Sequence, residues 1–187
     1  MMCRSEWDLA REGRNVDRDE LRRVQGPLKD RYRDDPAAAT ITLHAEGSLS
    51  DSDVTCSVQT GQALVAAGLH PATGGDGTFA CSGDMLLQAL AACAGVTLRS
   101  VATNRDIDVR GSVRAEGDLD FRGTLGIDRD APVGFRAIRL TFELESDASD
   151  DDLQALLTAT ERYCVVFQTL SRSPELAMTL RSAPESG

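Results

Sequence analysis

The longest apolar stretch of the chain is CSGDMLLQALAACAGVTLRSVATN, which covers residues 81–104. Its length and its many helix-forming residues predict a helix and not a strand. We expect Ser82 to be the N-cap, and Asp84 then lies where a negative charge meets the positive end of the helix dipole. Apolar residues occur on nearly all sides of this helix. It is therefore predicted to be enclosed by protein and to form the centre of the fold.

One thiol, Cys93, lies near the middle of this predicted helix, on one face with Leu86, Leu90 and Thr97. Gly95 and the neighbouring alanines allow other backbone to approach closely. The chain has five cysteines, an odd number without closely spaced pairs, which argues against a secreted disulfide framework. In a reducing compartment, a buried thiol is either a small apolar core residue or a redox centre.

The composition limits the partners that the chain can have. Its 187 residues suit one domain, and 30 acidic against 20 basic residues give a net charge of −10. This acidity argues against nucleic acid or an anionic membrane surface as a partner. The sequence suggests neither a bilayer-spanning segment nor a signal peptide, so we expect a cytoplasmic protein.

Residues 1–36 are rich in charge and are predicted to be an N-terminal extension outside the main domain. A capping-box pattern at Asp17 predicts a short surface helix that Gly26-Pro27 should stop. Arg31, Arg33 and a lysine follow close together. The simplest interpretation of that cluster is a solvated charged linker.

The remaining chain alternates between strand and helix patterns. A second long helix should begin at Ser149, with Asp152 three residues later, and Cys164 should lie in its middle on the apolar face. Residues 182–187 are expected to be a loose tail. The order is three strands, helix, three strands, helix, strand, which predicts an α+β domain with two helices against antiparallel sheet. The predicted strands cover residues 41–45, 54–58, 62–66, two segments within 108–127 that meet at Gly117-Asp118, 136–145 and 176–180, with a turn at 47–53.

Cys93 and Cys164 are thus predicted to lie on the core-facing sides of the two long helices. If these helices pack together, the two sulfurs can come within disulfide reach. In a cytoplasmic protein, such a pair suggests a cycling redox couple. The alternative is that both thiols simply fill space in the core.

Three sequence features resemble the OsmC/organic hydroperoxide resistance family. They are a Gly-Gly loop before the first helix, the run SGDMLLQALAAC ending at Cys93, and ERYCVV at residues 161–166. The family typically shows an Ala-rich run ending in Cys and a later Cys-Pro-Val. The resemblance covers about residues 40–181, and we take 37–181 as the domain. It implies an interwoven α+β homodimer with two central helices packed against antiparallel sheets.

The resemblance further implies an activity and roles for both thiols. Cys93 would be the peroxidatic cysteine and Cys164 the resolving one, in a thiol peroxidase that reduces hydroperoxides without a bound cofactor. Electrons would come from a dithiol such as a lipoyl group. The apolar surroundings favour an organic hydroperoxide over hydrogen peroxide. Arg31 and Arg33 are the candidates for the family's activating arginine, by position in the chain alone.

This sequence departs from the family pattern at several positions. The expected prolines are replaced by Ser82 or Gly83 before the first helix and by Val165 after the second cysteine. Gly83 stands where the hydroperoxide reductases keep a glutamate. Asp84 matches the acidic position of the OsmC-like branch, but nine residues of continuous helix would turn it away from Cys93, which favours a capping role.

Two other classes of function remain open. The first is a stress-associated, small-molecule-binding dimer without peroxidase activity, in which the cysteines are core residues. The second is a metal site built from His44, His70 and cysteines, which has no ligand-pair spacing in its favour.

Overall fold

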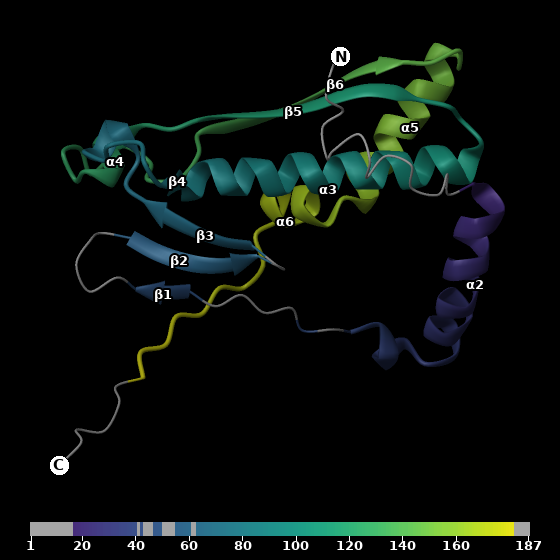
Figure 1. Ribbon diagram of the computed structural model, residues 1–187, viewed down its shortest axis with the longest axis horizontal. Coiled ribbons are helices and arrows are strands. Elements are labelled where there is room, and N and C mark those ends of the chain that lie inside the picture. The colour runs from purple at the N-terminus through teal and green to yellow at the C-terminus, as the bar shows by residue number, and fades with distance from the viewer. Residues whose placement is uncertain (1–16, 41, 43–46, 50–54, 61–62, 182–187) are drawn as a thin grey trace, which may run out of the picture.

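The computed structural model describes residues 17–40, 42, 47–49, 55–60 and 63–181, and it has the predicted mixed architecture of helices and antiparallel sheet (Figure 1). Its helices are α2 (Arg18–Asp34), η1 (Pro36–Ala39), η2 (Pro71–Thr73), α3 (Ser82–Arg105), α4 (Phe121–Thr124), α5 (Asp150–Tyr163) and α6 (Val165–Ser171). Its strands are β1 (Gly47–Leu49), β2 (Thr55–Thr60), β3 (Ala63–Gly68), β4 (Ala80–Cys81), β5 (Arg110–Asp118) and β6 (Ala137–Glu145).

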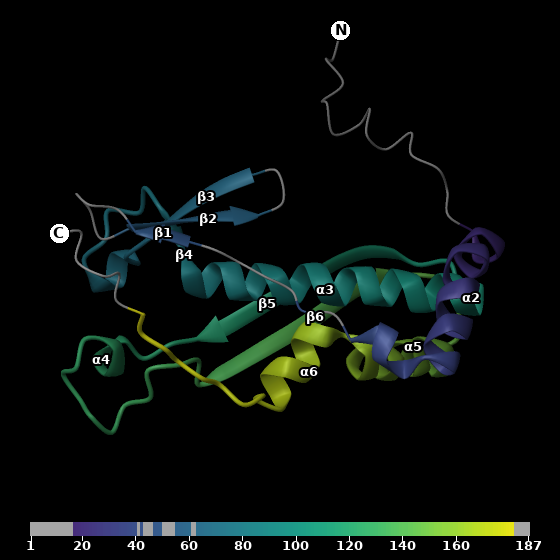
Figure 2. The same cartoon turned by 90° about the horizontal axis from the view of Figure 1, so that it is seen from below.

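The predicted central helix is α3, which lies between the two sheets and beside α5 and α6 (Figures 1 and 2). Its N-cap is Cys81 and not Ser82, and this cap makes no side-chain hydrogen bond, so Ser82 is the first helical residue. Asp84 lies in the first turn, as the dipole argument predicts. The helix ends at Arg105, and its C-cap is Asp106, whose φ of 64° is left-handed and whose N–H donates to the carbonyls of Ala102 and Thr103.

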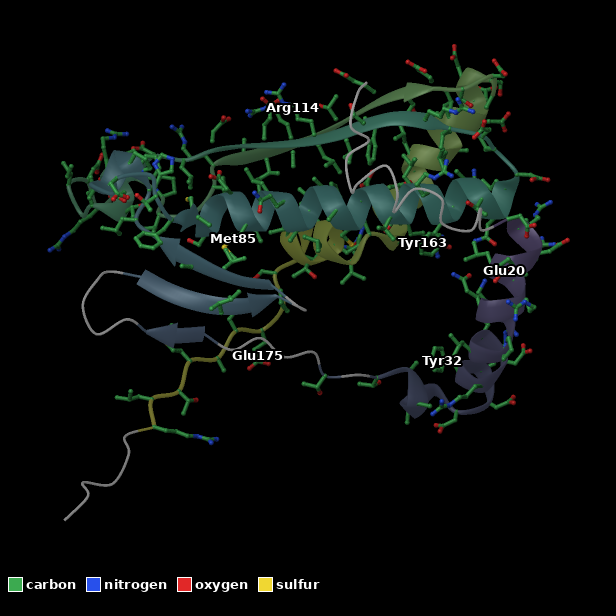
Figure 3. All side chains as sticks on the ribbon, viewed as in Figure 1. Glu20, Tyr32, Met85, Arg114, Tyr163 and Glu175 are labelled. Atoms are coloured by element: carbon green, nitrogen blue, oxygen red, sulfur yellow. The ribbon has the colours of Figure 1, made fainter. Side chains whose placement is uncertain are left out.

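A two-stranded antiparallel sheet of β5 and β6 covers one side of α3. Its alternate apolar residues face the helix, and Val113 pairs with Phe142 and Ala115 with Leu140. At Gly95 a Cβ atom would lie only 3.3 Å from Val113 Cγ1, so the glycine lets helix and sheet approach closely. Charged side chains such as Arg114 project from the opposite face of the sheet (Figure 3).

The second sheet has the order β1-β2-β3-β4, antiparallel except for the short parallel pair β3–β4. Strands β2 and β3 agree with the predicted segments 54–58 and 62–66. Strand β1 falls in the predicted turn at 47–53, and so corrects that part of the prediction. The predicted first strand, 41–45, lies outside the described residues except for residue 42.

The second long helix is interrupted, which the apolar periodicity did not predict. Helix α5 begins as expected, with the Ser149 hydroxyl accepting from the Asp152 N–H at 3.2 Å. It ends at Tyr163 because Cys164, with φ −73° and ψ 109°, is extended, and α6 starts at the next residue. Cys164 therefore lies between two helices and not within one.

Three other segments correct the sequence-based expectations. Helix α2 does not stop at Gly26-Pro27 but contains Pro27 and continues to Asp34. It ends there because Pro36 follows, and Asp35 is both the C-cap of α2 and the N-cap of η1. The final described segment, 176–180, which was predicted to be a strand, has no regular secondary structure. The predicted hairpin within 108–127 is a single strand, β5, followed by α4.

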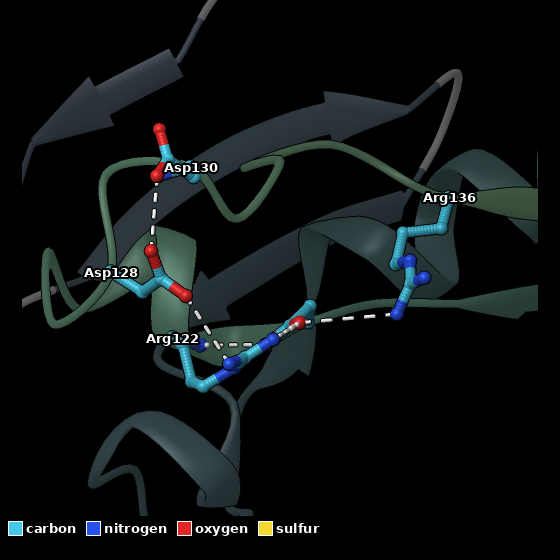
Figure 4. A network of polar contacts seen from close by, with 5 residues as sticks. Arg122, Asp128, Asp130 and Arg136 are labelled. Atoms are coloured by element: carbon cyan, nitrogen blue, oxygen red, sulfur yellow. Dashed lines mark hydrogen bonds and ion pairs between the residues drawn. The ribbon is translucent and has the colours of Figure 1, made fainter.

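An ion-pair network explains why the chain coils after β5. The Asp120 side chain accepts from the Arg122 N–H and caps α4, and the Arg122 guanidinium lies 2.6 Å from Asp120 and 3.2 Å from Asp128 (Figure 4). Arg136 adds a contact of 3.9 Å to Asp120. The hydrogen bonds from Arg122 lower the pKa of Asp120 to about 2. Phe121 of α4 stacks on the His70 ring, with centroids 4.9 Å apart.

Much of α3 remains uncovered in the single chain. Its buried residues lie on one line, Leu90, Ala94, Leu98 and Ala102. Contrary to the expectation from the sequence, this helix is long and apolar enough to cross a membrane, judged by length and composition alone, and 22% of its most apolar 18-residue window is buried. On the opposite face the small residues Ala89 and Ala92 are exposed, and Val96 is 71% exposed.

Candidate functional site

Cys93 and Cys164 lie in one apolar cluster between α3 and α6, two helices that lie side by side in Figure 2. Both belong to one apolar cluster with Leu90 and Ala94. Cys164 is only 1% exposed, whereas Cys93 is partly exposed, and both thiols are free. The proximity of the two thiols depends on the break between α5 and α6 at residue 164, because this break places the start of α6 against α3.

The first turn of α6 lies beside the two thiols and has backbone N–H groups without an acceptor in the helix. The first hydrogen bond within this helix runs from the Gln168 N–H to the Cys164 carbonyl, at 2.9 Å. The N–H groups of Val165, Val166 and Phe167 therefore have no acceptor within the helix. Val165 and Val166 lie close enough to Cys93 for their peptide groups to lower its pKa, and the peptide groups of Phe167 and Val166 act on Cys164 in the same direction.

These contacts separate the acidities of the two thiols. Burial raises the pKa of Cys93, but hydrogen bonds from the Val166 N–H, the Cys164 thiol, the Val165 N–H and the Thr97 hydroxyl outweigh burial and bring this pKa below its ordinary value. Burial and the neighbouring Cys93 sulfur raise the pKa of Cys164. The arrangement therefore favours a thiolate at Cys93 and a protonated, hydrogen-bond-donating thiol at Cys164.

Thr97 lies one helical turn after Cys93 and contacts it twice. Its hydroxyl donates to the Cys93 carbonyl at 2.8 Å, and it also faces the Cys93 sulfur. The bond to the carbonyl uses the one proton that the Thr97 hydroxyl has to donate. The sequence placed Thr97 on the same helix face as Cys93, and the structure confirms that neighbourhood.

The other predicted site residues lie away from the thiols. Because α3 is continuous, Asp84 lies about 13 Å from Cys93 along the axis and on the opposite side of the helix. Arg31 and Arg33 are exposed in the last turn of α2, and Arg33 pairs with Asp30. Helix α2 contacts the far end of α3, where Arg18 Nε donates to the Asn104 carbonyl at 3.0 Å.

Neither a cation nor a metal cluster accompanies the thiols in the described ranges. No arginine or lysine contributes to the lowered pKa of Cys93 there. The same part of the chain holds no group of three His, Cys, Asp or Glu side chains that could bind a metal ion. His70 uses Nδ1 to accept from the Ala72 N–H, and His44 lies outside the described residues.

A cavity of about 330 Å³ lies beside Cys164, between β6, α5 and α6. Leu140, Phe142, Leu157 and Phe167 form apolar walls, and Glu161 adds a carboxylate. This volume lies at the lower end of the range for small-molecule pockets. The sequence did not predict this cavity, because it depends on how the interrupted second helix packs against β6.

Comparison with known proteins agrees with this fold. The family model for OsmC-like proteins matches residues 75–179, which is more than half of the chain. No curated protein sequence matches the chain. Among solved structures, an OsmC-like protein from Mycoplasma pneumoniae is 19% identical with a TM-score of 0.59, and the match covers 71% of this chain and 89% of that one.

A second solved structure is an organic hydroperoxide resistance protein, OsmC, from Legionella pneumophila. It is 16% identical with a TM-score of 0.51, and the match covers 70% of this chain and 89% of that protein. A hypothetical protein from Aquifex aeolicus has the same identity and TM-score, with coverage of 72% and 90%. At these identities the structures support the fold, and the family model supports the assignment. The chain therefore belongs to the OsmC-like protein family.

Proposed function

We propose that this protein is a thiol-dependent peroxidase that reduces organic hydroperoxides. The observation that carries the proposal is the contact between Cys93, whose pKa is lowered, and the buried, protonated Cys164. A peroxide-reducing thiol must be a thiolate, and it needs a second thiol within reach to resolve its oxidised form. Family membership and the hydroperoxide resistance relative from Legionella agree with this activity.

The proposed cycle has three balanced steps. The Cys93 thiolate attacks the terminal peroxide oxygen, a sulfur–oxygen bond forms, the oxygen–oxygen bond breaks, and the alcohol leaves after taking a proton. Cys93 is then a sulfenic acid. The Cys164 sulfur attacks it, water leaves, and a Cys93–Cys164 disulfide forms. A dithiol such as a dihydrolipoyl group reduces this disulfide to two thiols and becomes a cyclic disulfide itself.

The surroundings of the thiols support an organic substrate. The cluster around Cys93 contains Leu90, Ala94, Val166 and Phe167. Apolar walls favour an alkyl or aryl hydroperoxide over hydrogen peroxide, because only the former buries apolar surface on binding. The cavity beside Cys164 supports access for a slender dithiol reductant to the resolving cysteine.

We also propose that the working form is a cytoplasmic homodimer. The uncovered face of α3, around Val96, is too apolar to remain in water over the length of a 24-residue helix. A sheet of only two strands, β5 and β6, is marginal without further strands. A second copy can cover α3 and extend the sheet. The free thiols in the described chain agree with a reducing compartment.

The C-terminal segment provides separate support for a dimer. Leu176, Met178 and Leu180 occupy alternate positions of a segment without regular secondary structure and are 82%, 101% and 93% exposed. Such alternation is typical of a strand whose apolar face is buried. The predicted last strand can therefore form when this segment pairs with a sheet edge of a second copy.

The proposed activity is tested by peroxide consumption with a dithiol reductant. Wild type should turn over an organic hydroperoxide, and Cys93→Ser should be inactive while remaining folded. Cys81→Ser is a matched control, because Cys81 is a partly buried, free thiol outside the pair. Peptide mapping after one equivalent of peroxide should find one intramolecular Cys93–Cys164 disulfide. If both thiols stay free in folded protein, the peroxidase proposal is wrong.

One alternative has an observation in its favour. Gly83 stands where the hydroperoxide reductases keep a glutamate, and within the described residues no cation lies beside Cys93. A stress-associated dimer that binds small molecules would need neither group. Such a protein should bind a hydrophobic ligand equally well before and after Cys93→Ser, and it should not consume peroxide.

A further inference from the structure

We propose that Gln168 is a positioning residue for Cys164: its side-chain amide bridges the break between α5 and α6 and fixes the angle at which Cys164 faces Cys93. This inference rests on the proposed role of Cys164 as the resolving cysteine. Its physical content, however, concerns only how fast one disulfide closes. It can therefore be tested without any peroxide.

The break leaves a carbonyl near the end of α5 that needs a donor. In a continuous helix the Glu161 carbonyl would accept from the N–H of Val165, four residues later. Cys164 is extended, and the bonds between backbone groups of the described chain do not include this one. Instead, Gln168 Nε2 donates to the Glu161 carbonyl at 2.9 Å. A side chain of α6 therefore replaces the missing backbone donor of α5.

Three hydrogen bonds together hold the backbone around Cys164. Its N–H donates to the Thr160 carbonyl at 2.9 Å, which ties it to α5. Its carbonyl accepts from the Gln168 N–H, also at 2.9 Å, which ties it to α6. These two bonds alone leave the angle between the helices free to change at Cys164. The bond from the Gln168 side chain to Glu161 closes a ring across the break and fixes that angle.

The angle matters because Cys93 belongs to a third helix, α3. Val166 and Phe167 of α6 pack in the same cluster as the two thiols, and Cys164 is only 1% exposed. Thiol–disulfide exchange requires the attacking sulfur to be held close to the bond that it breaks, and a misplacement of about 1 Å can slow such a step strongly. A change in the angle of α6 should therefore slow attack by Cys164 and leave attack by Cys93 unaffected.

Cystamine, a small disulfide, separates the two attacks. The Cys93 thiolate attacks one cystamine sulfur, a cysteamine thiol leaves, and Cys93 carries a mixed disulfide. Cys164 then attacks the Cys93 sulfur, the second cysteamine leaves, and the Cys93–Cys164 disulfide forms. Both protein thiols are oxidised and cystamine is reduced to cysteamine. Peptide mass spectrometry on acid-quenched samples gives the rate of each step.

Gln168→Met keeps a long, neutral side chain and removes the donor. It should slow closure of the disulfide by about two- to tenfold, as expected for the loss of one hydrogen bond, and leave the first step at the wild-type rate. Gln168→Lys keeps an N–H donor of similar reach and should restore closure. Thr169→Val is the matched control, because the Thr169 hydroxyl donates to the Val165 carbonyl at 2.8 Å within α6 and does not cross the break. It should leave both rates unchanged.

A second replacement covers the case in which methionine perturbs the fold. Gln168→Asn keeps the amide but is one methylene shorter, so it should also slow closure; circular dichroism checks the helix content of each variant. Closure at the wild-type rate in folded Gln168→Met or Gln168→Asn would overturn the inference. Equal slowing in Gln168→Lys or in Thr169→Val would do the same, because the effect would then not come from the bridging bond.

The two proposals can fail independently. Slowed closure in Gln168→Met, in a protein whose wild type consumes no peroxide, supports the positioning role and refutes the peroxidase activity. Active peroxidase in which Gln168→Met closes the disulfide at the wild-type rate does the opposite.

Discussion

The uncovered face of α3 gives the sharpest test of the proposed assembly. Val96 is 71% exposed in the single chain, between Ala92 and Arg99 on the side opposite Leu98. Fully burying a valine is worth about 1.5 to 3 kcal/mol, so covering the exposed part contributes about 1 to 2 kcal/mol. A twofold interface counts this contribution twice, which gives about 2 to 4 kcal/mol for a dimer.

Val96→Asp removes this contribution and adds a charge that must be desolvated. The dimer dissociation constant should rise by about 30-fold to several hundredfold, since each 1.4 kcal/mol is a factor of ten. Sedimentation velocity over a dilution series measures this constant directly. Ile127→Asp is the matched control, because Ile127 is 72% exposed but lies after α4 and away from α3. The reasoning is refuted if Val96→Asp dimerises as tightly as wild type, or if wild type is a folded monomer at micromolar dilution.

Three further predictions concern the core and the thiols. Replacing Leu156, which is 0% exposed, by alanine should lower the free energy of unfolding by about 2 to 5 kcal/mol, as measured by urea titration at fixed protein concentration. In single turnover, the peroxide reaction rate should rise with pH through the pKa of Cys93 and level off above it, with a midpoint below that of an ordinary thiol because the surroundings of Cys93 lower its pKa. Cys164→Ser should stop after one turnover and leave Cys93 to over-oxidise to sulfinic acid, which intact-mass spectrometry would detect as the mass of two added oxygen atoms.

The sequence was most informative where one physical signal dominated. The apolar composition of residues 81–104 predicts α3, and alternation at Ile138, Leu140, Phe142 and Leu144 predicts β6. The cap at Ser149 was also predicted correctly, because a serine three residues before an aspartate satisfies a specific N–H. These signals are local and do not depend on the rest of the fold.

The prediction failed where local signals were weak or where a distant residue decided the structure. The apolar spacing Leu157, Thr160, Cys164, Phe167 continues through the break between α5 and α6, so periodicity alone could not reveal it. The segment after β5 contains strand-like apolar residues, but Asp120 caps a helical turn with the Arg122 N–H and thereby prevents a hairpin.

The break at Cys164 also changed what could be expected of the site. From sequence, the two thiols were helix residues that could meet only if the helices packed side by side. The structure instead places Cys164 immediately before α6, where the first N–H groups of the helix have no acceptor within it. No residue type in this stretch marks these donors, because they belong to the backbone. Peptide groups of this kind are found only after the dihedral angles are known.

The arginine candidates lead to a prediction about which protomer supplies them. Helix α2 contacts α3 through Arg18 at Asn104, about 16 Å along the axis from Cys93, and then leads away from α3 (Figure 1). Arg31 is thirteen residues further along α2, about 20 Å from that contact. Neither Arg31 nor Arg33 can therefore reach the Cys93 sulfur of its own chain. If either one activates the thiolate, it does so across the dimer.

Mixed dimers test this directly. Protomers with Cys93→Ser keep both arginines, and protomers with Arg31→Ala and Arg33→Ala keep the thiol; each homodimer should be inactive if the arginines are required. After co-refolding equal amounts, half of the dimers are mixed, and each has one site with both a thiol and the partner's arginines. Peroxide consumption should then recover to about one quarter of wild type. No recovery from two separately inactive parents means that the arginines do not act across the dimer. Full activity of the double arginine variant alone means that Arg31 and Arg33, at the charged end of α2, have no part in the chemistry.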